Sequence, residues 1–562
     1  MLAFFCAILM LLSGGKPVQE APRVEVRIDR THAAPGVAVV VEFPGDSDGA
    51  SEVSVSEEWG GISGAAADIA NLAALDERGS TLVVERAADH RWSIRHEPGA
   101  RVRVTYFLSP GAREPLADGH NDFRTIATDE MIFAIGHHAL ALPDHIDGEA
   151  IVGVEWEGFD GWHVASSLGP GAARIESPIS GDDLRSCLFI AGAPGRMNVH
   201  ERALGEGRVG VAIVRADWGF DDGRFLDLTA RILDTERAFF DDRHSPWYLV
   251  ALTPRGRAEK GSFSLGGTGL THCFALSCDT GLDLTPGSGH ELRMLLLLAH
   301  ECLHEWNGRI VRVDGEEGSA YWFSEGFTDY LSRRLLRDSG LISESQYLDE
   351  LNTSLARYDA NPAREAPNNR IVREFWTDPD VSELPYRRGD LLALAIDEYA
   401  RRSNQPRSID SLMRDLAARG RGGHPPIPSE ELINRLGTIA PQLGVEGIRA
   451  VVLDGAPVPL PDTLEDGTLA LREGKMREYD PGLDVERSRS RGLVVGIVPG
   501  SGAAEACLTE GAPMKGVRTL PGVADGPPRM EILLVGDDGS ERTLTYDAVG
   551  SVRVVRRYVP AE

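Results

Sequence analysis

The sequence predicts a multi-domain α+β protein in three parts: an N-terminal β-sandwich, a mostly helical middle domain and a small C-terminal β domain. The chain has 562 residues, enough for about three to four domains. Short alternating runs fill residues 22–215, a helical period begins near residue 220, and strand-like runs return after residue 480. Of the residues, 42% are hydrophobic and 26% are charged, which is typical of a globular protein.

The first residues are typical of an export signal. The apolar run from Leu2 to Leu12 is too short to cross a bilayer, and the small residues Ser13 and Gly15 follow it at the spacing of a cleavage site. We expect residues 1–15 to be a signal peptide and the protein to be periplasmic, secreted or held at the cell surface. No Lys or Arg precedes the run, so the alternatives are an uncleaved N-terminal anchor or a wrongly assigned start of the chain. No later stretch is apolar for long enough to span a membrane.

The charge balance and the cysteines exclude further classes of protein. Lys and Arg number 58 against 86 Asp and Glu, a formal net charge of −28. Nucleic acids and anionic lipid surfaces attract cationic proteins, so neither is an expected partner. No CxxC pair occurs, which argues against a thiolate metal site or a dense disulfide framework. We expect the five cysteines beyond Cys6 to be small buried residues, with a local Cys273–Cys278 pair as the alternative.

Residues 22–215 are expected to form the antiparallel β-sandwich. Alternating apolar and polar residues bounded by Gly, Pro and Asp indicate strands. These strands cover 24–28, 37–43, 80–86, 101–108 and 149–157. A helical pattern interrupts them at most once, at Ala65–Leu75. The adjacent His137 and His138 would point to opposite faces of a strand, so we do not expect them to bind one metal.

Residues 216–460 are expected to form the helical domain, and 480–555 the last β domain. An amphipathic helix at 224–243 precedes a strand and a Gly-rich segment, 261–278, and a long helix follows at 291–308. Further helices are expected at Trp322–Arg337, Glu344–Tyr358, Arg387–Arg402, Ser408–Arg419 and Ser429–Leu436. In the tail we expect a strand at 491–499 and a hairpin at 530–548 with an Asp-Gly turn.

The helix at 291–308 carries the strongest chemical signal, His300-Glu301-Cys302-Leu303-His304. Residues four apart lie on one face of a helix, so His300 and His304 can bind one metal, and Glu301 can act as general base on a water bound there. The preceding run Leu295–Ala299 makes the helix mostly interior, and buried imidazoles and carboxylates need partners that a zinc ion supplies. HExxH also occurs by chance, so the motif alone leaves a metal-free helix open.

Glu325 is the candidate for the third ligand that a catalytic zinc needs. It stands in the first turn of the next expected helix, at a separation from His304 that allows the chain to return beside the histidines. A carboxylate that caps a helix start is the alternative. Asp329, one turn later, is expected either to accept the second N–H of a ligand histidine or to be solvated. Together these residues predict one zinc per chain.

These residues resemble the glycyl aminopeptidase family of gluzincin metallopeptidases. The matching stretches are H-E-C-L-H-E-W-N-G-R and W-F-S-E-G-F-T-D-Y. The resemblance implies an N-terminal β-domain, a thermolysin-like catalytic domain and a C-terminal PDZ domain, in the order that the chain shows. It also implies zinc ligands at His300, His304 and Glu325, with Glu301 as the base.

Tyr386 is the next residue that the resemblance assigns. In such enzymes a Tyr stands three residues before a Gly and opens a helix, and Tyr386 and Gly389 in P-Y-R-R-G-D fit that pattern. The resemblance implies that this phenol donates to the oxyanion of a tetrahedral intermediate. A ring that packs at a helix start is the alternative.

The substrate loop departs from the family pattern. The family's G-G-L-E-H supplies a Glu that holds a free α-amine. The equivalent residues here are Gly269, Leu270, Thr271 and His272. A hydroxyl at position 271 cannot pair with an ammonium, and no other acid lies within 261–278. We therefore predict action on internal bonds or blocked peptides, with Asp279 as the anchor to consider if a free amine is preferred.

The tail departs from the family as well. The PDZ pattern S-P-A-x-x-A-G-L-x-x-G-D appears with its Pro, Gly and Asp replaced by Gly502, Cys507 and Ala512. We expect a degenerate PDZ-like domain at 480–555, and we leave open whether it binds peptides by strand addition.

The sequence therefore predicts an exported zinc metallopeptidase that acts on peptide or protein substrates. The alternative is a non-hydrolytic member of the same family, a zinc-stabilised scaffold or a peptide-binding protein. Glu301 favours the enzyme, because a scaffold has no need of a base that is not a ligand. A purely structural surface protein would require the HExxH, Glu325 and Tyr386 matches all to be accidental.

Overall fold

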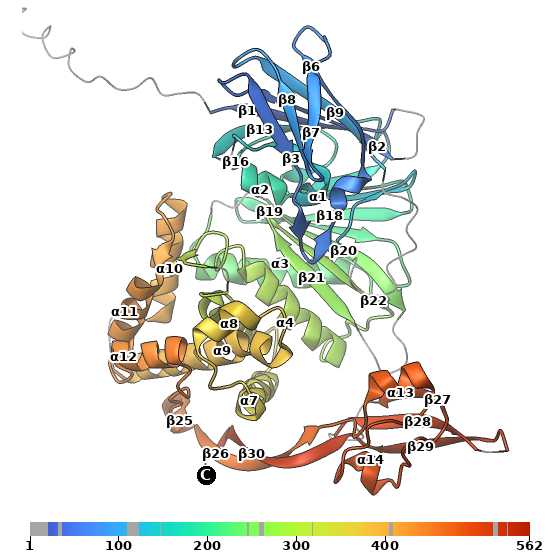
Figure 1. Cartoon of the computed structure of the whole chain (residues 1–562). Helices are drawn as coiled ribbons and strands as arrows, with labels where there is room; N and C mark the ends of the chain where they lie inside the picture. The colour runs from blue at the N-terminus through green and yellow to red at the C-terminus, as the bar shows by residue number, and fades with distance from the viewer. Residues whose placement is uncertain are drawn as a thin grey trace, which may run out of the picture.

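The structure, a computed structural model, describes residues 21–31, 36–109, 123–146, 148–243, 247–257, 264–316, 318–403, 408–520, 527–536 and 538–561. The expected signal peptide, residues 1–15, lies outside these ranges. A β domain, a sheet covered by helices, and a small domain on a two-stranded arm follow one another along the chain (Figure 1). No helix in the described ranges combines the length and the apolar character needed to cross a bilayer.

The N-terminal domain is built on a six-stranded sheet. In sheet order, its strands are β16 (Ile175–Ser180), β13 (Glu149–Glu157), β1 (Arg23–Asp29), β2 (Val37–Pro44), β9 (Arg101–Leu108) and β6 (Ile69–Asp76). Burial alternates along β9, where Val102, Val104 and Tyr106 are buried and Arg103 is exposed. This period of two puts one face of the sheet into a core, as the sequence pattern predicts.

Two smaller sheets complete this domain. One has the order β12 (Leu142–Pro143), β3 (Ala50–Ser54), β8 (Arg91–Arg95) and β7 (Val83–Ala88). The other has the order β10 (Ile126–Ala127), β11 (Met131–Ile135), β17 (Leu188–Gly192), β14 (His163–Ser166) and β15 (Gly169–Pro170). Minor elements are the β4 (Glu58–Trp59)–β5 (Ile62–Ser63) hairpin and the short helices α1 (Gly136–Ala139) and α2 (Gly181–Arg185). Residues of all three sheets, such as Val39, Ile94 and Phe189, form one buried core.

The predicted helix at Ala65–Leu75 is wrong. Only Ala65–Asp68 turns, as the 3₁₀ segment η1, and the rest forms β6 at the edge of the large sheet. Pairing with β9 overrides the helix propensity of this Ala-rich stretch, and Asn71 takes a φ of 56° where the register shifts. His137 and His138 lie on α1 rather than on a strand, and no candidate metal group among the described residues includes them.

The middle part begins with a five-stranded sheet. Its order is β18 (Met197–Leu204), β19 (Gly207–Val214), β20 (Trp247–Arg257), β22 (Cys273–Thr280) and β21 (Leu265–Leu270). Helix α3 (Asp222–Phe239) connects β19 to its parallel neighbour β20, and β21 is an antiparallel edge strand. The expected domain limit between residues 215 and 216 stays a prediction. Sheet pairing crosses this limit, because β18 and β19, which precede it, lie in the same sheet as β20, which follows it.

Both faces of this sheet are buried. Leu249 and Ala251 of β20 pack in one core with residues of the N-terminal domain such as Leu188. Val250 and Leu252, which point the other way, pack in the core formed with the helices. A strand buried on both faces is apolar at successive positions rather than at alternate ones, as the first half of β20, residues 247–252, is here.

Helices α3 and α4 (Gly289–Leu303) lie against the second face of this sheet, and the later helices share one core with them. In chain order the later helices are α5 (Tyr321–Ser324), α6 (Gly326–Asp338), α7 (Glu344–Ala360), α8 (Asn368–Glu374), α9 (Pro379–Arg402), α10 (Ile409–Arg421), α11 (Ser429–Ile439) and α12 (Gly444–Arg449), followed by the π turn η2 (Ala450–Asp454). A short pair, β23 (Val313–Asp314) and β24 (Ile427–Pro428), lies among them. The predicted helix Trp322–Arg337 is split at Glu325. The one predicted at Arg387–Arg402 begins earlier, because Asp378 caps it and Pro379 occupies its first turn.

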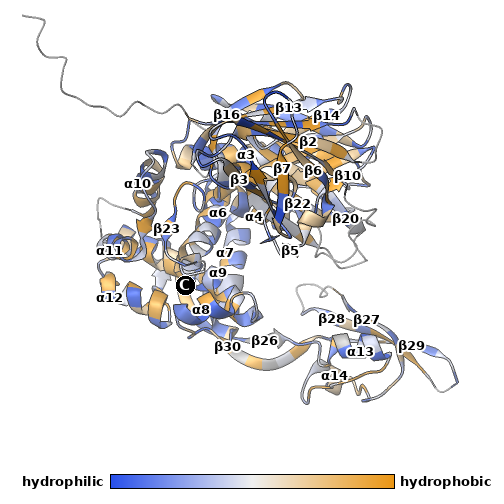
Figure 2. Cartoon of the chain, turned by 45° about the horizontal axis from the view of Figure 1, so that its top comes forward, coloured by the Kyte–Doolittle hydropathy of each residue, from blue (hydrophilic) through white to orange (hydrophobic). Residues whose placement is uncertain are grey.

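The C-terminal part is a small domain inserted between two paired strands. The arm consists of β25 (Thr463–Leu464), the turn η3 (Glu465–Gly467), β26 (Leu469–Tyr479) and β30 (Val549–Pro560). The small domain holds α13 (Val485–Arg491), α14 (Gly502–Glu505), β27 (Met514–Leu520), β28 (Arg529–Val535) and β29 (Glu541–Asp547). Figure 2 shows it set apart from the other two parts. The predicted hairpin at 530–548 is present as β28 and β29. The predicted strand at 491–499 is not, since only Leu493 forms a bridge there.

Candidate active site

The candidate metal ligands His300 and His304 stand at the C-terminal end of α4. Ser288 caps the start of this helix by accepting a hydrogen bond from the backbone N–H of Glu291. Leu298 and Cys302 are buried in the core. The histidines are offset from them by two residues, about 200° around the helix, so the imidazoles lie on the other side.

Three ligand atoms converge beside this helix. The Nε2 atoms of His300 and His304 are 3.0 Å apart, and Glu325 Oε2 lies 3.3 Å from the first and 3.4 Å from the second. Metal–ligand bonds of about 2.0–2.1 Å at tetrahedral angles give ligand–ligand distances of about 3.3 Å. The spacing of these atoms therefore fits a single zinc ion with all three residues as ligands.

The outer ring nitrogens of both histidines are bonded to acceptors. His300 Nδ1 is 2.8 Å from Asp329 Oδ1, and His304 Nδ1 is 2.9 Å from the carbonyl oxygen of Asn307. Carboxylate and carbonyl oxygens only accept, so each Nδ1 carries the hydrogen. Each Nε2 lone pair is then free to face the point where a metal binds, which is the arrangement of metal-ligating histidines generally.

Asn307 connects the histidine turn to the segment that carries Glu325. Its side-chain amide, fully buried, donates to the carbonyl oxygen of Phe323 at 3.1 Å and to the hydroxyl of Thr328 at 3.0 Å. The neighbouring Trp306 donates from Nε1 to Asp242 at 2.7 Å. Through these hydrogen bonds, Trp306 and Asn307 hold the turn after the second histidine in place beside the segment that carries Glu325.

Glu325 and Tyr386 are brought together by a close crossing of α9 over the junction of α5 and α6. A Cβ on Gly389 would lie 1.9 Å from the carbonyl oxygen of Trp322, and one on Gly326 would lie 2.3 Å from Gly389 Cα. Only glycines permit this approach. Tyr386, one turn before Gly389, places its ring centroid 6.1 Å from that of His300. It lies inside α9, so the expectation that it opens the helix is wrong.

Burial and the neighbouring ionisable groups shift the pKa values of Glu325 and Tyr386. Burial alone would raise the pKa of Glu325, but the imidazoles of His304 and His300 outweigh burial and hold that pKa well below its ordinary value. Burial raises the pKa of Tyr386, and the charges of Glu325 and Asp329 raise it further. The phenol therefore keeps its proton at neutral pH and can donate a hydrogen bond.

The edge strand β21 runs beside α4, next to the candidate base. A Cβ on the exposed Gly269 would lie 3.8 Å from Glu301 Oε2. Leu270 is buried, and Thr271 is only 3% exposed, with its hydroxyl donating to Asp183 Oδ1 at 3.3 Å. His272 is half-buried and reaches Glu305. Thr271 thus lies in the interface with the N-terminal domain.

Asp279 lies away from this turn, at the other end of β22. Its carboxylate accepts a hydrogen bond from the backbone N–H of Ser264 at 2.7 Å. The acids that adjoin the turn are Asp183 and Glu305, which the sequence analysis did not single out. Asp183 is far away in sequence and gives no local signal, whereas Glu305 follows the second histidine directly.

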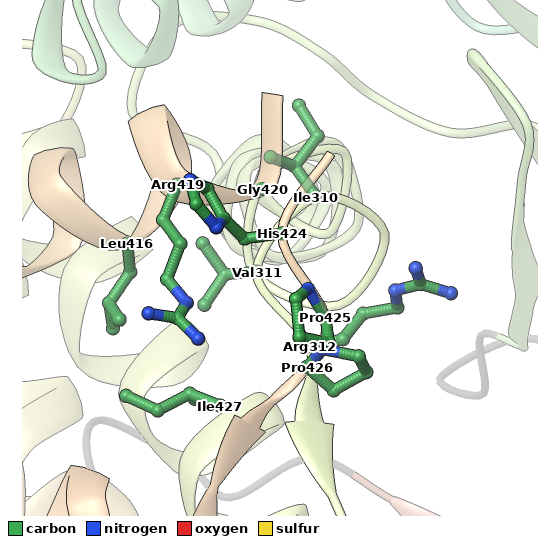
Figure 3. A pocket seen from close by; sticks show the side chains of 10 residues that line it. All are labelled: Ile310, Val311, Arg312, Leu416, Arg419, Gly420, His424, Pro425, Pro426 and Ile427. Atoms are coloured by element: carbon green, nitrogen blue, oxygen red, sulfur yellow. The ribbon is translucent and has the colours of Figure 1, made fainter. Parts of the chain in front are cut away.

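A small hollow lies beyond the histidine turn (Figure 3). Residues Ile310 to Arg312 and the segment His424–Ile427 border it, and Arg419 and Leu416 of α10 point toward it. Its volume is about 10 Å³. Since a single water molecule needs about 10–15 Å³, this hollow has room for one water at most and is too small for a ligand.

Comparison with protein families confirms the resemblance found in the sequence. Residues 293–373 match the M61 glycyl aminopeptidase family. This segment contains both histidines, Glu301 and Glu325. No curated protein sequence matches the chain.

Two solved structures share the fold. An aminopeptidase N family protein from Idiomarina loihiensis aligns with a TM-score of 0.67 at 17% identity, over 95% of this chain and 97% of that chain. An M1 zinc metallopeptidase from Deinococcus radiodurans aligns with a TM-score of 0.50 at 16% identity, over 79% of this chain and 96% of that chain. The three-part architecture is therefore that of an aminopeptidase-type fold.

Proposed function

We propose that this protein is a zinc metallopeptidase that hydrolyses peptide bonds. The observation that carries the proposal is the convergence of His300 Nε2, His304 Nε2 and Glu325 Oε2 at the spacing of a zinc site. Glu301 stands on the same helix without being one of these ligands. The family match over residues 293–373 supports the peptidase class.

The positions of the residues support the roles that we propose for them. His300, His304 and Glu325 would hold the zinc, which when bound supplies the Lewis acid that makes water a nucleophile at neutral pH. Glu301 takes a proton from the attacking water and passes it to the leaving amine. Tyr386 donates a hydrogen bond to the carbonyl oxygen as it becomes negative.

The edge strand β21 offers a binding surface for the peptide. Residues Leu265–Thr268 are half-buried and Gly269 is exposed, and no strand of the described chain pairs with the outer side of β21. An extended peptide can bind such an edge by main-chain hydrogen bonds. Gly269 adjoins Glu301, so a peptide bound there would place a carbonyl group near the base.

We further propose that a free amino terminus is not required. Thr271 is buried and already bonded to Asp183, so it offers no partner to an ammonium ion. The test compares one peptide with free and acetylated amino ends on the wild type and on Thr271→Glu. Equal cleavage by the wild type supports the proposal. A strong preference for the free amine contradicts it and directs attention to Asp183.

Three finer assignments belong to the same proposal. The middle part is a thermolysin-like gluzincin domain, and the small domain is a degenerate PDZ-like module. In the small domain, Cys507 has a φ of 56°, a backbone conformation that favours the glycine of the PDZ pattern. The protein is exported, with the leader at residues 1–15.

Cleavage of a peptide mixture by the zinc-loaded protein, followed by mass spectrometry, tests the activity. The matched control is Glu301→Gln, which keeps every ligand and removes the base. We expect the wild type to cleave and the variant to hold zinc without cleaving. Wild-type protein with a full equivalent of zinc that cleaves no peptide would favour the non-hydrolytic scaffold instead.

A further inference from the structure

The turn between β21 and β22 is strained. Leu270 and Cys273 are paired, so only Thr271 and His272 form the turn. His272 has a φ of 49°, in the left-handed region that non-glycine residues rarely adopt. Such a conformation persists only where surrounding contacts hold it, and it concentrates at functional sites.

The side chain of His272 is bonded to a residue just beyond the C-terminal end of α4. Its Nδ1 donates to Glu305 Oε1 at 2.8 Å, and the Glu305 side chain is only 1% exposed. Arg309 bonds both oxygens of the same carboxylate. Glu305 follows the ligand His304 directly.

Two hydrogen bonds connect the same turn to the N-terminal domain. The backbone N–H of Thr271 donates to the carbonyl oxygen of Ser186 at 3.0 Å, and its hydroxyl donates to Asp183 at 3.3 Å. Asp183 is oriented in turn by the hydroxyl of Ser180, at 2.8 Å from its other oxygen. Two adjacent residues thus connect the edge strand to two different parts of the molecule.

We propose that the 271–272 turn fixes β21 at the distance from Glu301 that a bound peptide requires, and that α2 of the N-terminal domain contributes to this positioning. This inference rests on the proposed peptidase function. His272 and Thr271 are positioning residues, because they act through β21 and not on the substrate. The strain at His272 is then the cost of reaching Glu305 from a two-residue turn.

The experiment removes the His272–Glu305 and Thr271–Asp183 hydrogen bonds one at a time in the full-length, zinc-loaded protein. His272→Gly removes the bond to Glu305 and the left-handed strain together. Thr271→Val removes the hydroxyl bond to Asp183 with little change of shape. Cys507→Gly is the matched control, because Cys507 is also left-handed, with a φ of 56°, but lies in the small domain. The readouts are zinc content, KM, kcat and amide hydrogen exchange along β21, with β18 as the internal reference edge strand.

We expect His272→Gly to raise KM about tenfold, the scale of one hydrogen bond to a charged group, with kcat changed less. Exchange along β21 should quicken while β18 and the zinc content stay as in the wild type. Thr271→Val should change KM and the exchange rate along β21 in the same direction but by less. Cys507→Gly should change neither. Unchanged KM and unchanged exchange in His272→Gly would overturn the inference. If the wild type cleaves nothing, the proposed function fails, and the exchange of β21 alone still decides whether the turn positions the strand.

Discussion

Tyr386 is the single residue whose proposed role is easiest to isolate. Its phenol is not a proposed zinc ligand, and its raised pKa keeps it protonated at neutral pH. Tyr386→Phe should lower kcat by about 10²–10³-fold, the usual effect of one lost oxyanion donor, and leave the zinc content unchanged. Steady-state kinetics with metal analysis of the same sample provide the test. A variant with the wild-type rate would remove Tyr386 from the mechanism.

Glu236 of α3 is a buried acid that the mechanism does not use. It is 1% exposed, and neither of its oxygens has a hydrogen-bond partner in the described part of the chain. Burial raises its pKa well above the ordinary value of 4.5. The folded protein therefore keeps this proton at pH values where the unfolded chain has lost it.

The sign of the resulting pH effect follows from linkage. The folded state binds more protons than the unfolded state above the ordinary carboxyl pKa, so this residue makes the free energy of unfolding fall as pH rises toward its folded pKa. Glu236→Gln has no such proton to lose. We expect its stability relative to the wild type to increase between about pH 5.5 and pH 8 in urea unfolding of the zinc-loaded proteins. A difference that does not vary with pH would contradict a raised pKa.

The convergence of the candidate metal ligands His300 and His304 could be predicted from the sequence, because their spacing on one helix fixes them locally. His300, Glu301 and His304 share one helix, and their spacing alone defines their geometry. Asp183 and Glu305 were missed for different reasons. Asp183 reaches the β21–β22 turn only through the packing of two domains, and the carboxylate of Glu305 contacts that turn rather than the candidate metal ligands.

At the scale of elements, the crossing of α9 over the α5–α6 junction sets the distance between Glu325 and Tyr386. Gly389→Ala would place a methyl group 1.9 Å from the carbonyl oxygen of Trp322. Such overpacking costs about 1–3 kcal/mol and moves the two elements apart. We expect lower zinc affinity in a chelator competition assay and a lower kcat.

The control for this prediction is Gly447→Ala on α12. A Cβ at that position meets nothing within 4 Å, so the substitution should be neutral or stabilise by about 0.5–1 kcal/mol. Gly389→Ala with wild-type zinc affinity and rate would show that the crossing does not set the site.

Helices and strands were predicted well where a local sequence pattern determines them. They were predicted poorly where pairing with a distant strand determines the structure. The alternation of β9 and the Asp-Gly hairpin of β28 and β29 are both visible in the sequence. The Ala-rich stretch that forms β6 has a helical composition, and only its pairing with β9 makes it a strand. Likewise, Glu325 interrupts a continuous helical pattern where α5 ends and α6 begins.

At the scale of the whole molecule, the last strand packs with the helical part of the chain. Tyr558 of β30 is fully buried in the core formed by the helices, and its backbone N–H donates to Asn352 at 2.7 Å. Arg556 is paired with Asp359 of α7. The small domain, by contrast, lies between Tyr479 and Val549, which are themselves paired.

This connectivity predicts that the small domain can be removed without loss of the site. Residues 481–547 replaced by an Asn-Gly turn would join Asp480 to Ala548, whose backbones are already hydrogen-bonded at 3.1 Å. The shortened protein should bind zinc and cleave peptides, whereas deletion of residues 549–562 should destabilise the helical core. Thermal unfolding and peptide cleavage of both variants are the measurements. A shortened protein that binds zinc but no longer cleaves would place the small domain in substrate binding.

The most direct test of the account is the metal content and the metal's ligands in the purified protein. Elemental analysis should give one zinc per chain, and X-ray absorption should show two imidazole nitrogens and a carboxylate oxygen at about 2.0–2.2 Å. His304→Ala should lose the metal, and Glu301→Gln should retain it. Less than about half an equivalent of zinc, not restored by added zinc, or a ligand set without two imidazoles, would contradict the assignment of His300, His304 and Glu325.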